Sequence, residues 1–501
     1  MIRPLYSHAR SLDSIGALLG VPAETAETAE TGGAEVEILG MTNVSSEIHE
    51  GDLFLAFPGA KNHGARFVQE AKLLGARAVL TDTEGAPLVT DLPTLVVDDP
   101  RKAAGDISSW FYGEPMRDMY SAGITGTNGK TTTTTLLHQI WTLAGREGGL
   151  VGTVETRIGR DVIASKRTTP ESAELQSLVA TMRERHVRNL AMEVSSHAIA
   201  LKRMRGAHFN SIGFSNLTQD HLDFHGSMEE YFLTKSSLFT FEFADRAFIN
   251  IDDAYGAKLA ASTSLPVIRL SRSDPKADWT YVSVHPHLNG QDVCLRGPGG
   301  VLLEGTLALH GEFNLDNALM AIAIAFDSGI DLVDLGALLP RLSGAQGRLE
   351  RIDVGQPFSA FVDYAHSPDS VTRVLATCKA LTKGKVIAVL GCGGDRDSSK
   401  RPLMGAAIFQ GADVAIFTSD NPRSEDPLHI LNQMTAGLDI KSPNCIISDR
   451  TEAINHAASI AQPGDVVVVL GKGHESGQDI KGEITPFDDR IVLAGAIEAR
   501  T

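Results

Sequence analysis

The last third of the chain alternates short apolar runs with segments of helical periodicity. Four of the apolar runs have the length and β-branched content of buried strands, and polar residues follow each of them. Strand and helix in alternation predict a parallel sheet, and the carboxyl ends of parallel strands meet at one edge. The sequence therefore predicts a rim of polar side chains that faces a ligand. The rim residues are Asp363, Asp395, Arg396, Asp420, Asn421, Arg423, Lys472, His474 and Glu475.

In the middle of the chain, a strand, a glycine-rich loop and a helix follow one another. The segment S-A-G-I-T-G-T-N-G-K-T-T-T-T-T begins at Ser121, after a short apolar segment. Residues 136–144 continue as an amphipathic helix that Gly145 ends. This order is typical of a phosphate cradle, in which backbone N–H groups and a helix N-terminus face an anion. Lys130 would bring a mobile positive charge, and Thr131 would hold the Mg²⁺ that accompanies a nucleotide.

The glycine spacing departs from the strict G-x-x-x-x-G-K-[ST] pattern, because Ile124 stands six residues before Lys130. Gly126 and Gly129 lie inside the loop instead. A turn before an ordinary helix is the alternative interpretation of a bare Gly-Lys-Thr. With two glycines, a lysine and a threonine between strand and helix, nucleotide binding is favoured.

Two more strands of the central region are expected to end in polar clusters. Such a cluster often only caps a helix, but beside a nucleotide loop it is a candidate for catalysis. The spacing matches no zinc signature, so Mg²⁺ ligation or hydrogen bonding to substrate is preferred. The first cluster contains Glu193, Ser195, Ser196 and His197, and the second contains Asp220, His221, Asp223 and His225.

A helix that should begin after Ser227 has a lysine on its apolar face. Ser227 and Glu230 form an S-x-x-E capping box, and apolar residues from Met228 to Phe239 recur at helical spacing. Lys235 falls on the same face. Its stem could pack there while its head reaches solvent. Alternatively, desolvation lowers its pKa and makes a neutral amine available to react.

Composition narrows the class of protein. The chain has 501 residues, enough for about three domains. Its formal charge of −17 argues against binding to nucleic acid or to an anionic membrane surface. A signal-peptide core and an apolar stretch of 18 residues are both absent from the sequence, which predicts a cytoplasmic protein without a membrane span. The four cysteines form no C-x-x-C pair, so free thiols are expected rather than disulfides or structural zinc.

Three domains are expected, at 1–105, 106–343 and 344–501. The first is a small α/β domain with a low-complexity A-E-T repeat, expected to be solvated, and two polar turns between 44 and 64. The second becomes strand-like and rich in turns beyond residue 251.

Three residues near the end of the second region could belong to the nucleotide site. Asn314 and Asn317 lie on the first turns of a predicted helix, where they could cap it or reach a nucleotide base. Arg348 lies between the second and third regions.

Together these motifs resemble the Mur ligases, the ATP-dependent amide-forming enzymes of cell-wall precursor synthesis. The motifs G-I-T-G-T-N-G-K-T-T, E-V-S-S-H, N-L-T-Q-D-H-L-D-F-H-G, G-E-F-N-L-D-N-A, G-R-L-E and D-Y-A-H-S-P occur in family order. The resemblance covers nearly the whole chain. It implies an α/β protein with an N-terminal UDP-binding domain, a central P-loop-type ATPase domain with a mostly parallel sheet, and a C-terminal Rossmann-like domain.

The resemblance also implies a reaction and its cofactors. ATP would phosphorylate the D-glutamyl side-chain carboxylate of a UDP-N-acetylmuramoyl dipeptide, and an amine of meso-diaminopimelate would displace phosphate. Two Mg²⁺ sites and a CO₂-derived carbamate on Lys235 are expected, with a monomeric enzyme as the working form. The implied catalytic residues are Lys130, Glu193, His221 and Lys235, and the implied metal ligands are Thr131, Glu193, His221 and carbamylated Lys235.

The matching motifs carry three sets of binding residues. The implied ATP-binding residues are Gly126, Thr127, Asn128, Gly129, Lys130, Thr131, Thr132, Asn317, Arg348 and Asp363. The implied diaminopimelate-binding residues are Arg396, Asp420, Asn421, Pro422, Arg423, Gly471 and Glu475. The implied UDP-substrate residues are Asn43, Ser45, Ala60, Lys61, Asn62, Thr168, Thr169, Ser195 and Arg203.

In two places the chain departs from the family pattern. The family often has D-S-R where this chain has V-S-S around Ser45, and Leu201 stands where a glutamine is common. Uridine recognition is therefore expected to differ in detail.

Several alternatives stay open at this point. Sister ligases that add L-lysine or a dipeptide are the nearest, and D-N-P-R argues against both, because Arg423 offers a planar fork for a second carboxylate. Folylpolyglutamate synthase shares the phosphate loop but would not need the N-terminal domain. A nucleotide-dependent switch protein is the alternative from another class.

Overall fold

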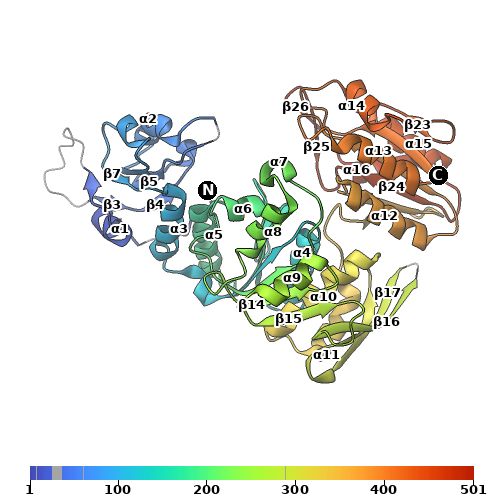
Figure 1. Cartoon of the computed structure of the whole chain (residues 1–501), viewed down its shortest axis with the longest axis horizontal. Helices are drawn as coiled ribbons and strands as arrows, with labels where there is room; N and C mark the ends of the chain where they lie inside the picture. Colours follow the sequence, from blue (N-terminus) through green and yellow to red (C-terminus); the bar gives the residue numbers. More distant parts are fainter. Residues whose placement is uncertain (7, 25–35, 60, 288, 501) are drawn as a thin grey trace.

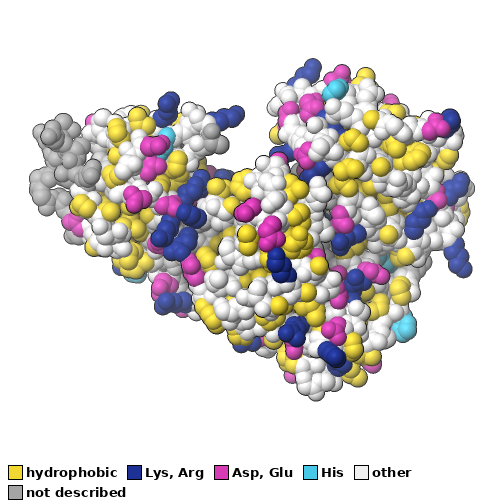
Figure 2. All heavy atoms as spheres, in the orientation of Figure 1, with side chains coloured by type: hydrophobic (Ala, Val, Ile, Leu, Met, Phe, Trp, Pro, Cys, Tyr) yellow, Lys and Arg dark blue, Asp and Glu magenta, His cyan; other side chains and the backbone are white. Residues whose placement is uncertain are grey.

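The computed structural model describes residues 1–6, 8–24, 36–59, 61–287 and 289–500. Ala60 and most of the A-E-T repeat lie outside these residues. Figure 1 shows three α/β parts in chain order, with the middle part between the other two. The first and third parts stand apart above the middle part, and the surface is hollowed between them (Figure 2). This confirms the predicted three-part α/β architecture.

The N-terminal part is built on a five-stranded sheet in which four neighbouring strands are parallel. Because β4 and β5 are parallel neighbours, the polar turns that follow them leave the same edge of the sheet. The strands in sheet order are β2 (Ala23–Glu24), β7 (Thr94–Val96), β6 (Ala78–Thr81), β5 (Asp52–Leu55) and β4 (Gly40–Thr42), and β1 (Arg10–Ser11) pairs separately with β3 (Glu37–Ile38). The helices are α1 (Leu12–Leu19), η1 (Ser45–Glu47), η2 (Gly64–Phe67), α2 (Val68–Leu73), η3 (Ala86–Leu88) and α3 (Pro100–Phe111).

The central part contains an eleven-stranded sheet whose middle strands are all parallel. Strands β10, β17 and β18 run antiparallel to their neighbours. The last two lie in the region beyond residue 251, where the sequence predicts strands separated by turns. The sheet order is β11 (Asp161–Ala164), β10 (Glu155–Ile158), β9 (Gly148–Val151), β12 (Asn189–Glu193), β8 (Tyr120–Thr125), β13 (Phe209–Phe214), β14 (Ala244–Asn250), β15 (Val267–Ser271), β16 (Trp279–His287), β17 (Gly290–Arg296) and β18 (Leu302–Leu307).

Helices pack on both faces of this sheet (Figure 1). Helix α5 also packs against α3 of the N-terminal part. The helices are η4 (Pro115–Asp118), α4 (Lys130–Leu143), α5 (Ser172–Glu184), α6 (Ser196–Ala200), α7 (Leu222–His225), α8 (Met228–Ser236), α9 (Ala254–Ser262), η5 (Pro298–Gly300), α10 (Glu312–Asp327), α11 (Leu332–Leu338) and η6 (Leu339–Arg341).

Helix α4 begins at Lys130, six residues before the predicted amphipathic stretch. Its first turns contain five consecutive threonines, whose β-branched side chains are poor helix formers. The helix forms because these turns are held from outside. Thr131 donates to the Glu193 carboxylate of β12, and Thr133 donates to Asn317 of α10. The sequence pattern therefore places the start of α4 too late, because it misses the turns next to the glycine loop.

Helix α8 begins where the sequence predicts, after Ser227, and Lys235 lies on its apolar face as predicted. The Ser227 side chain accepts a hydrogen bond from the Glu230 N–H, so Ser227 caps the helix. The helix ends at Ser236, earlier than predicted, and Phe239 lies beyond it although it is buried. Lys235 is 1 % exposed and shares the buried face with Tyr231.

The C-terminal part is a six-stranded sheet with the predicted parallel strands β20, β24, β21 and β22 side by side. The sheet order is β19 (Glu350–Arg351), β20 (Ser359–Asp363), β24 (Val466–Leu470), β21 (Val386–Cys392), β22 (Val414–Ser419) and β23 (Cys445–Ile446), with β25 (Gly477–Ile480) and β26 (Glu483–Pro486) as a separate hairpin. The helices are α12 (Pro368–Leu381), α13 (Lys400–Gly411), α14 (Pro427–Met434), α15 (Arg450–Ile460) and α16 (Asp489–Glu498).

A buried ion pair fixes the edge from which the polar rim projects. Arg450 and Asp489 are both fully buried and bond through two nitrogens and two oxygens. Arg450 also donates to the carbonyls of Ser419 and Leu470, the last residues of β22 and β24. The two loops at residues 420–423 and 471–475 therefore start from firmly placed strand ends.

Among the residues described, no helix has both the length and the apolar character required to cross a membrane. Cys294, Cys378, Cys392 and Cys445 are all free thiols, as predicted.

Candidate active site

The glycine loop between β8 and α4 has a backbone that requires glycine at two positions. Gly126 has φ +145° and Gly129 has φ +91°. A Cβ on Gly126 would lie 1.9 Å from Ser215 Oγ, and one on Gly129 would lie 2.2 Å from Asn317 Oδ1. The loop thus passes too close to its neighbours for a side chain at either glycine, and it leads directly into the N-terminus of α4, where an anion binds favourably.

Two lysine side chains approach this loop from opposite sides. Lys130 Nζ donates to the carbonyls of Gly126 and Thr127, each at 2.9 Å. Lys235 Nζ donates to the same Gly126 carbonyl at 2.9 Å and lies 4.8 Å from the Tyr231 ring centre. Burial, reinforced by the charge of Lys130, holds the pKa of Lys235 well below its ordinary value. Desolvation of this kind favours the uncharged form of the amine.

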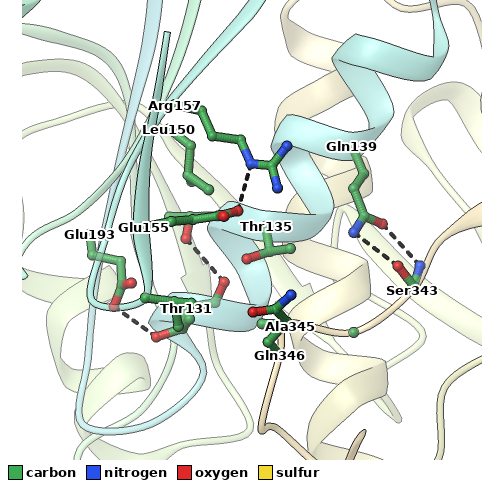
Figure 3. A pocket seen from close by; sticks show the side chains of 14 residues that line it. Thr131, Thr135, Gln139, Leu150, Glu155, Arg157, Glu193, Ser343, Ala345 and Gln346 are labelled. Carbon is green, nitrogen blue, oxygen red and sulfur yellow. Dashed lines mark hydrogen bonds and ion pairs between the residues drawn. The ribbon is translucent and has the colours of Figure 1, made fainter. Parts of the chain in front are cut away.

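Thr131 and Glu193 place oxygen atoms beside the loop. Thr131 Oγ1 donates to Glu193 Oε2 at 2.9 Å, and the Thr153 N–H holds Glu193 Oε1 at 2.7 Å. Figure 3 shows the Thr131–Glu193 contact at one end of a pocket that runs along α4. At the other end of the pocket, Gln139 forms two hydrogen bonds with Ser343 of the segment that leads to the C-terminal part (Figure 3).

A second cavity lies on the other side of the loop and joins the central and C-terminal parts. Six of the predicted ATP-binding residues line it, namely Asn128, Gly129, Thr132, Asn317, Arg348 and Asp363. Arg348 packs 4.4 Å from the Tyr364 ring centre, and its Nη2 reaches Thr131 Oγ1 at 3.5 Å. Burial raises the pKa of Asp363 to about 6, although Arg348 opposes the shift.

A third cavity, with a volume of about 390 Å³, is lined by polar residues at the rim of the C-terminal sheet. It is lined by Arg396, Asp420, Asn421, Arg423, Gly471 and Glu475 from that sheet, together with His221 of the central part. Pro422 lies in the same loop as Arg423. The structure therefore brings together residues that lie up to 254 positions apart in the chain. We call it the amino-acid cavity.

In the amino-acid cavity, the guanidinium groups of Arg396 and Arg423 line the same space as the carboxylates of Asp420 and Glu475. Arg423 adopts φ +51°, and its Nη1 donates to the Gly394 carbonyl at 2.6 Å, which turns the planar group toward the Arg396 loop. Glu475 is half-buried beside Asn421. Such a set can hold carboxylates and an ammonium group of one small molecule.

One ion pair crosses between the central and C-terminal parts inside this cavity. Lys400 Nζ, at the first residue of α13, lies 2.7 Å from Asp220 Oδ1. Asp220 is also paired with His221 at 3.3 Å. Burial works against its ionisation, but His221 and Lys400 hold the pKa of Asp220 at about 2. Burial lowers the pKa of His221 to about 4, so its imidazole is neutral at pH 7.

The predicted UDP-substrate residues fall into two groups. Thr169 Oγ1 donates to the Glu193 carbonyl at 2.9 Å and accepts from the Ser195 N–H, and Arg203 donates to the Thr169 carbonyl. Thr168 is also in this group, bonded to Thr153. The other group, Asn43, Ser45, Lys61 and Asn62, lies on the two turns after β4 and β5. Ion pairs connect the segments that carry the two groups: Glu47, beside Ser45, pairs with Lys166, beside Thr168.

Sequence reasoning left several contributors to the site without a role. Ser215 Oγ donates to the Asn128 carbonyl at 2.6 Å, and Asn216 Oδ1 accepts from the Asn128 N–H at 3.0 Å. Lys472 was placed in the polar rim without a role of its own, and Lys400 was not among the candidate site residues. No local sequence pattern identifies Lys400 as a site residue, because its partner, Asp220, lies 180 positions away in the chain. Asn216 could have been chosen, since it opens a motif already singled out.

This fold and this site define a class of protein: a nucleotide-binding enzyme in which a phosphate loop and an amino-acid-sized cavity on a separate domain share one wall. Family models match the chain in three places. The model described as "Mur ligase family, catalytic domain" covers residues 37–112, "Mur ligase middle domain" covers 124–325, and "Mur ligase, glutamate ligase domain" covers 347–473.

Relatives of established name match over nearly the full length. The chain is 46 % identical to the UDP-N-acetylmuramoyl-L-alanyl-D-glutamate--2,6-diaminopimelate ligase of Streptomyces coelicolor, covering 99 % of this chain and 98 % of that protein. It is 40 % identical to the protein of the same name from Corynebacterium glutamicum, covering 96 % and 95 %. A solved structure of a ligase of that name aligns with TM-score 0.68 and 31 % identity over 98 % of this chain and 99 % of the other. The chain therefore belongs to the Mur ligase family, whose members bind ATP.

Proposed function

We propose that the protein is the ligase that joins meso-2,6-diaminopimelate to UDP-N-acetylmuramoyl-L-alanyl-D-glutamate, at the expense of ATP, during peptidoglycan precursor synthesis. The observation that carries this proposal is the amino-acid cavity. Arg423, Arg396 and Glu475 face a space that also contains His221, next to the phosphate loop. Meso-diaminopimelate carries two carboxylates and two amines, and this cavity is lined by guanidinium groups, among them Arg396 and Arg423, and by carboxylates, among them Asp420 and Glu475.

The reaction proceeds in two balanced steps. In the first step, the side-chain carboxylate of the D-glutamyl residue attacks the γ-phosphorus of ATP, and ADP leaves with the electrons of the broken P–O bond. In the second, a neutral amine of diaminopimelate attacks the acyl phosphate, an amide bond forms, and inorganic phosphate and a proton are released. Phosphoryl transfer depends mainly on positioning and on charge neutralisation.

Residues of the phosphate loop neutralise charge in the first step. Lys130 and the N–H groups from Gly129 to Thr132 would hold the phosphates at the start of α4, because the N–H groups of Thr127 and Asn128 already donate to Asn216. Arg348 lies on the same side, where its positive charge opposes the repulsion between carboxylate and triphosphate. Asn317 and Asp363 line the cavity that would receive the nucleoside.

Mg²⁺ fits the oxygen atoms of Thr131 and Glu193, which are hard donors of the kind that this ion prefers. The described residues contain no group of three His, Cys, Asp or Glu side chains arranged for a metal, so substrate phosphates would complete the coordination. When bound, the ion neutralises phosphate charge. His221, with its neutral ring, and Lys235 as a carbamate would hold a second ion.

Carbamylation of Lys235 is supported by its surroundings. Its amine is 1 % exposed, its pKa is strongly lowered by burial, and Lys130 lies close enough to add to the shift. A neutral amine adds CO₂ and becomes an anionic carbamate. The modified side chain would then offset the positive charge of Lys130 rather than add to it.

The UDP-sugar dipeptide would span the N-terminal and central parts. Asn43, Ser45, Ala60, Lys61 and Asn62 would hold the uridine end, and Thr168, Thr169, Ser195 and Arg203 would hold the sugar and peptide. The domain limits of 1–105, 106–343 and 344–501, the cytoplasmic location and the monomeric state stay predictions. Helix α3 runs across the first of these limits.

An assay of phosphate release tests the proposal. Release from ATP should require both the UDP-muramoyl dipeptide and meso-diaminopimelate, and L-lysine should replace diaminopimelate poorly. The product should gain the mass of diaminopimelate less one water. Preference for L-lysine would refute the assigned substrate, and release independent of both substrates would instead support a nucleotide switch.

A further inference from the structure

Lys472 lies in the loop that carries Gly471 and Glu475, two residues that line the amino-acid cavity, and it has no assigned role. It stands two residues after the end of β24, and its side chain is 0 % exposed. Its ammonium donates to Asn421 Oδ1 at 2.9 Å, to Glu475 Oε2 at 3.1 Å and to the Gly477 carbonyl at 2.7 Å. An ammonium has three protons, so all of its donors are used by the protein. Lys472 therefore has no donor left for a substrate carboxylate.

The contact with Lys472 fixes the orientation of the Asn421 amide. Asn421 Oδ1 accepts from Lys472 Nζ and also from the Asp479 N–H at 3.0 Å. Both neighbours are donors only, so the amide nitrogen cannot occupy the oxygen position without losing both bonds. Asn421 Nδ2 must then point the other way, where it donates to Glu475 Oε2 at 2.8 Å.

Glu475 thus receives two hydrogen bonds on one carboxylate oxygen and none on the other. Lys472 and the Asn421 amide both donate to Oε2. Within the described part of the chain, Oε1 has no hydrogen-bond partner, and the side chain lines the amino-acid cavity. The carboxylate is therefore held by one oxygen and presents the other to a ligand.

The chemistry of the ligand follows from the groups around that oxygen. Arg423 and Arg396 supply positive charge for carboxylates in the same cavity. An acceptor oxygen among them suits an ammonium group on the carbon that bears a carboxylate. Meso-diaminopimelate has such a group at both ends, and the one remote from the new amide bond keeps its ammonium because its amine is not the nucleophile.

We propose that Lys472 is a positioning residue that acts through Glu475: it orients the Asn421 amide and one oxygen of Glu475, so that the other oxygen binds the remote ammonium of the amino-acid substrate. This inference rests on the proposed function. It assigns Lys472 to recognition of one amine, not to phosphoryl transfer and not to the general stability of the sheet edge.

A double-mutant cycle tests this inference. Lys472→Met, Glu475→Gln and the double variant are compared with the wild type in kcat/KM for meso-diaminopimelate. A hydrogen bond to a charged group corresponds to about a tenfold to hundredfold effect. We expect each single variant to raise the KM for diaminopimelate by about that factor while kcat changes by less than about threefold. If Lys472 acts through Glu475, the double variant should be no worse than Glu475→Gln alone.

A substrate that lacks the remote amine provides the second readout. 2-Aminopimelate has both carboxylates and one amine, which serves as the nucleophile. Lys472→Met should lower its kcat/KM by less than about twofold, because the contact that Lys472 prepares is missing from that substrate. A purely structural role would impair both amino acids equally.

Controls separate misfolding from loss of recognition. Lys441→Met removes an exposed lysine of the same part of the chain and should leave every constant unchanged. ADP binding and thermal unfolding establish that each variant is folded, and Lys472→Gln takes the place of Lys472→Met if the latter is not. Additive effects in the double variant, or equal loss with 2-aminopimelate, would overturn the inference. Failure of the wild type to use meso-diaminopimelate would instead refute the proposed function.

Discussion

Arg423 is the residue whose chemistry separates diaminopimelate from lysine. Its φ of +51° is uncommon for a residue with a side chain, and its backbone is fixed on both sides by the β25 strand, through Asp479 and Lys481. The Cα position of Arg423 is therefore fixed, which limits the positions that its guanidinium group can occupy. A carboxylate at the remote end of the substrate meets it, and the ammonium of lysine alone would not.

Replacing Arg423 by Ala should lower kcat/KM for meso-diaminopimelate about tenfold to hundredfold, because a charge-assisted bond is lost. The affinity for ATP, measured by calorimetry, should change by less than about twofold, since Arg423 does not line the nucleotide cavity. Arg500→Ala, on an exposed arginine of the same part, is the control. An equal loss of ATP affinity would contradict the assignment.

Lys235 should carry a carbamate in a buffer that contains bicarbonate. With ¹³C-bicarbonate, the wild type should show a carbamate signal by ¹³C NMR, and activity should fall after CO₂ is removed and return when bicarbonate is added. Lys235→Arg should lose the signal, whereas Lys258→Arg, on an exposed lysine of α9, should keep it. The same signal in Lys235→Arg would place the modification elsewhere.

At the scale of single elements, α4 carries a buried histidine. His138 is 5 % exposed, its Nε2 is without a partner among the described residues, and Gly148 of β9 lies against its ring. Burial, assisted by the charge of Arg157, lowers the pKa of His138 to about 4. The folded protein therefore keeps this ring neutral where the unfolded chain would protonate it.

This shift predicts acid sensitivity. Between the unfolded pKa of about 6.5 and the folded value of about 4, the unfolded state binds the proton and the folded state does not. The stabilising contribution is present above pH 6.5 and is lost as the pH falls toward 4, by up to about 3 kcal/mol. In His138→Leu, the melting temperature should fall less between pH 7.5 and pH 5 than in the wild type. Parallel pH profiles for the two proteins would refute the prediction.

Most elements could be predicted because their signals are local. The four parallel strands of the C-terminal sheet are buried on both faces, so they are continuous apolar runs, and Ser227 marks the start of α8 through a contact only three residues long. The beginning of α4 was missed because its five threonines favour other conformations and only tertiary contacts make them helical. Phe239 was assigned to α8 because burial beyond a helix end has the same pattern as burial within it.

For the site, sequence reasoning found the residues but not their connections. The loop glycines, Arg423 and Glu475 each stand in recognisable motifs. The Lys400–Asp220 ion pair and the contact of Arg348 with Thr131 depend on how separate domains meet, and sequence spacing carries no information on that.

At the scale of the whole molecule, the reaction requires two domains to hold their substrates in contact. Lys400 of the C-terminal part and Asp220 of the central part form an ion pair across that junction, with side chains 22 % and 9 % exposed. Such a partly buried pair favours the arrangement in which the amino-acid cavity adjoins the phosphate loop. Loss of one partner leaves the other charge desolvated and unpaired.

Lys400→Met should therefore favour a more open arrangement. Small-angle scattering in the presence of ADP should give a larger radius of gyration than for the wild type, and kcat/KM for diaminopimelate should fall about tenfold or more. Lys379→Met, which removes an ion pair inside the C-terminal part, should change neither quantity. Unchanged scattering together with unchanged kinetics would show that the pair does not hold the domains together.

The threonines at the start of α4 have a consequence for how the enzyme responds to ATP. Each costs about 0.6 kcal/mol of helix propensity relative to alanine, so the first turns of this helix are intrinsically weak and depend on their neighbours. A bound triphosphate would add a counter-charge at the amide end of the helix and suppress its local opening. Amide hydrogens from Thr132 to Thr135 should then exchange with solvent more slowly in the ATP-bound enzyme than in the free enzyme. Their exchange rate would therefore report whether nucleotide is bound.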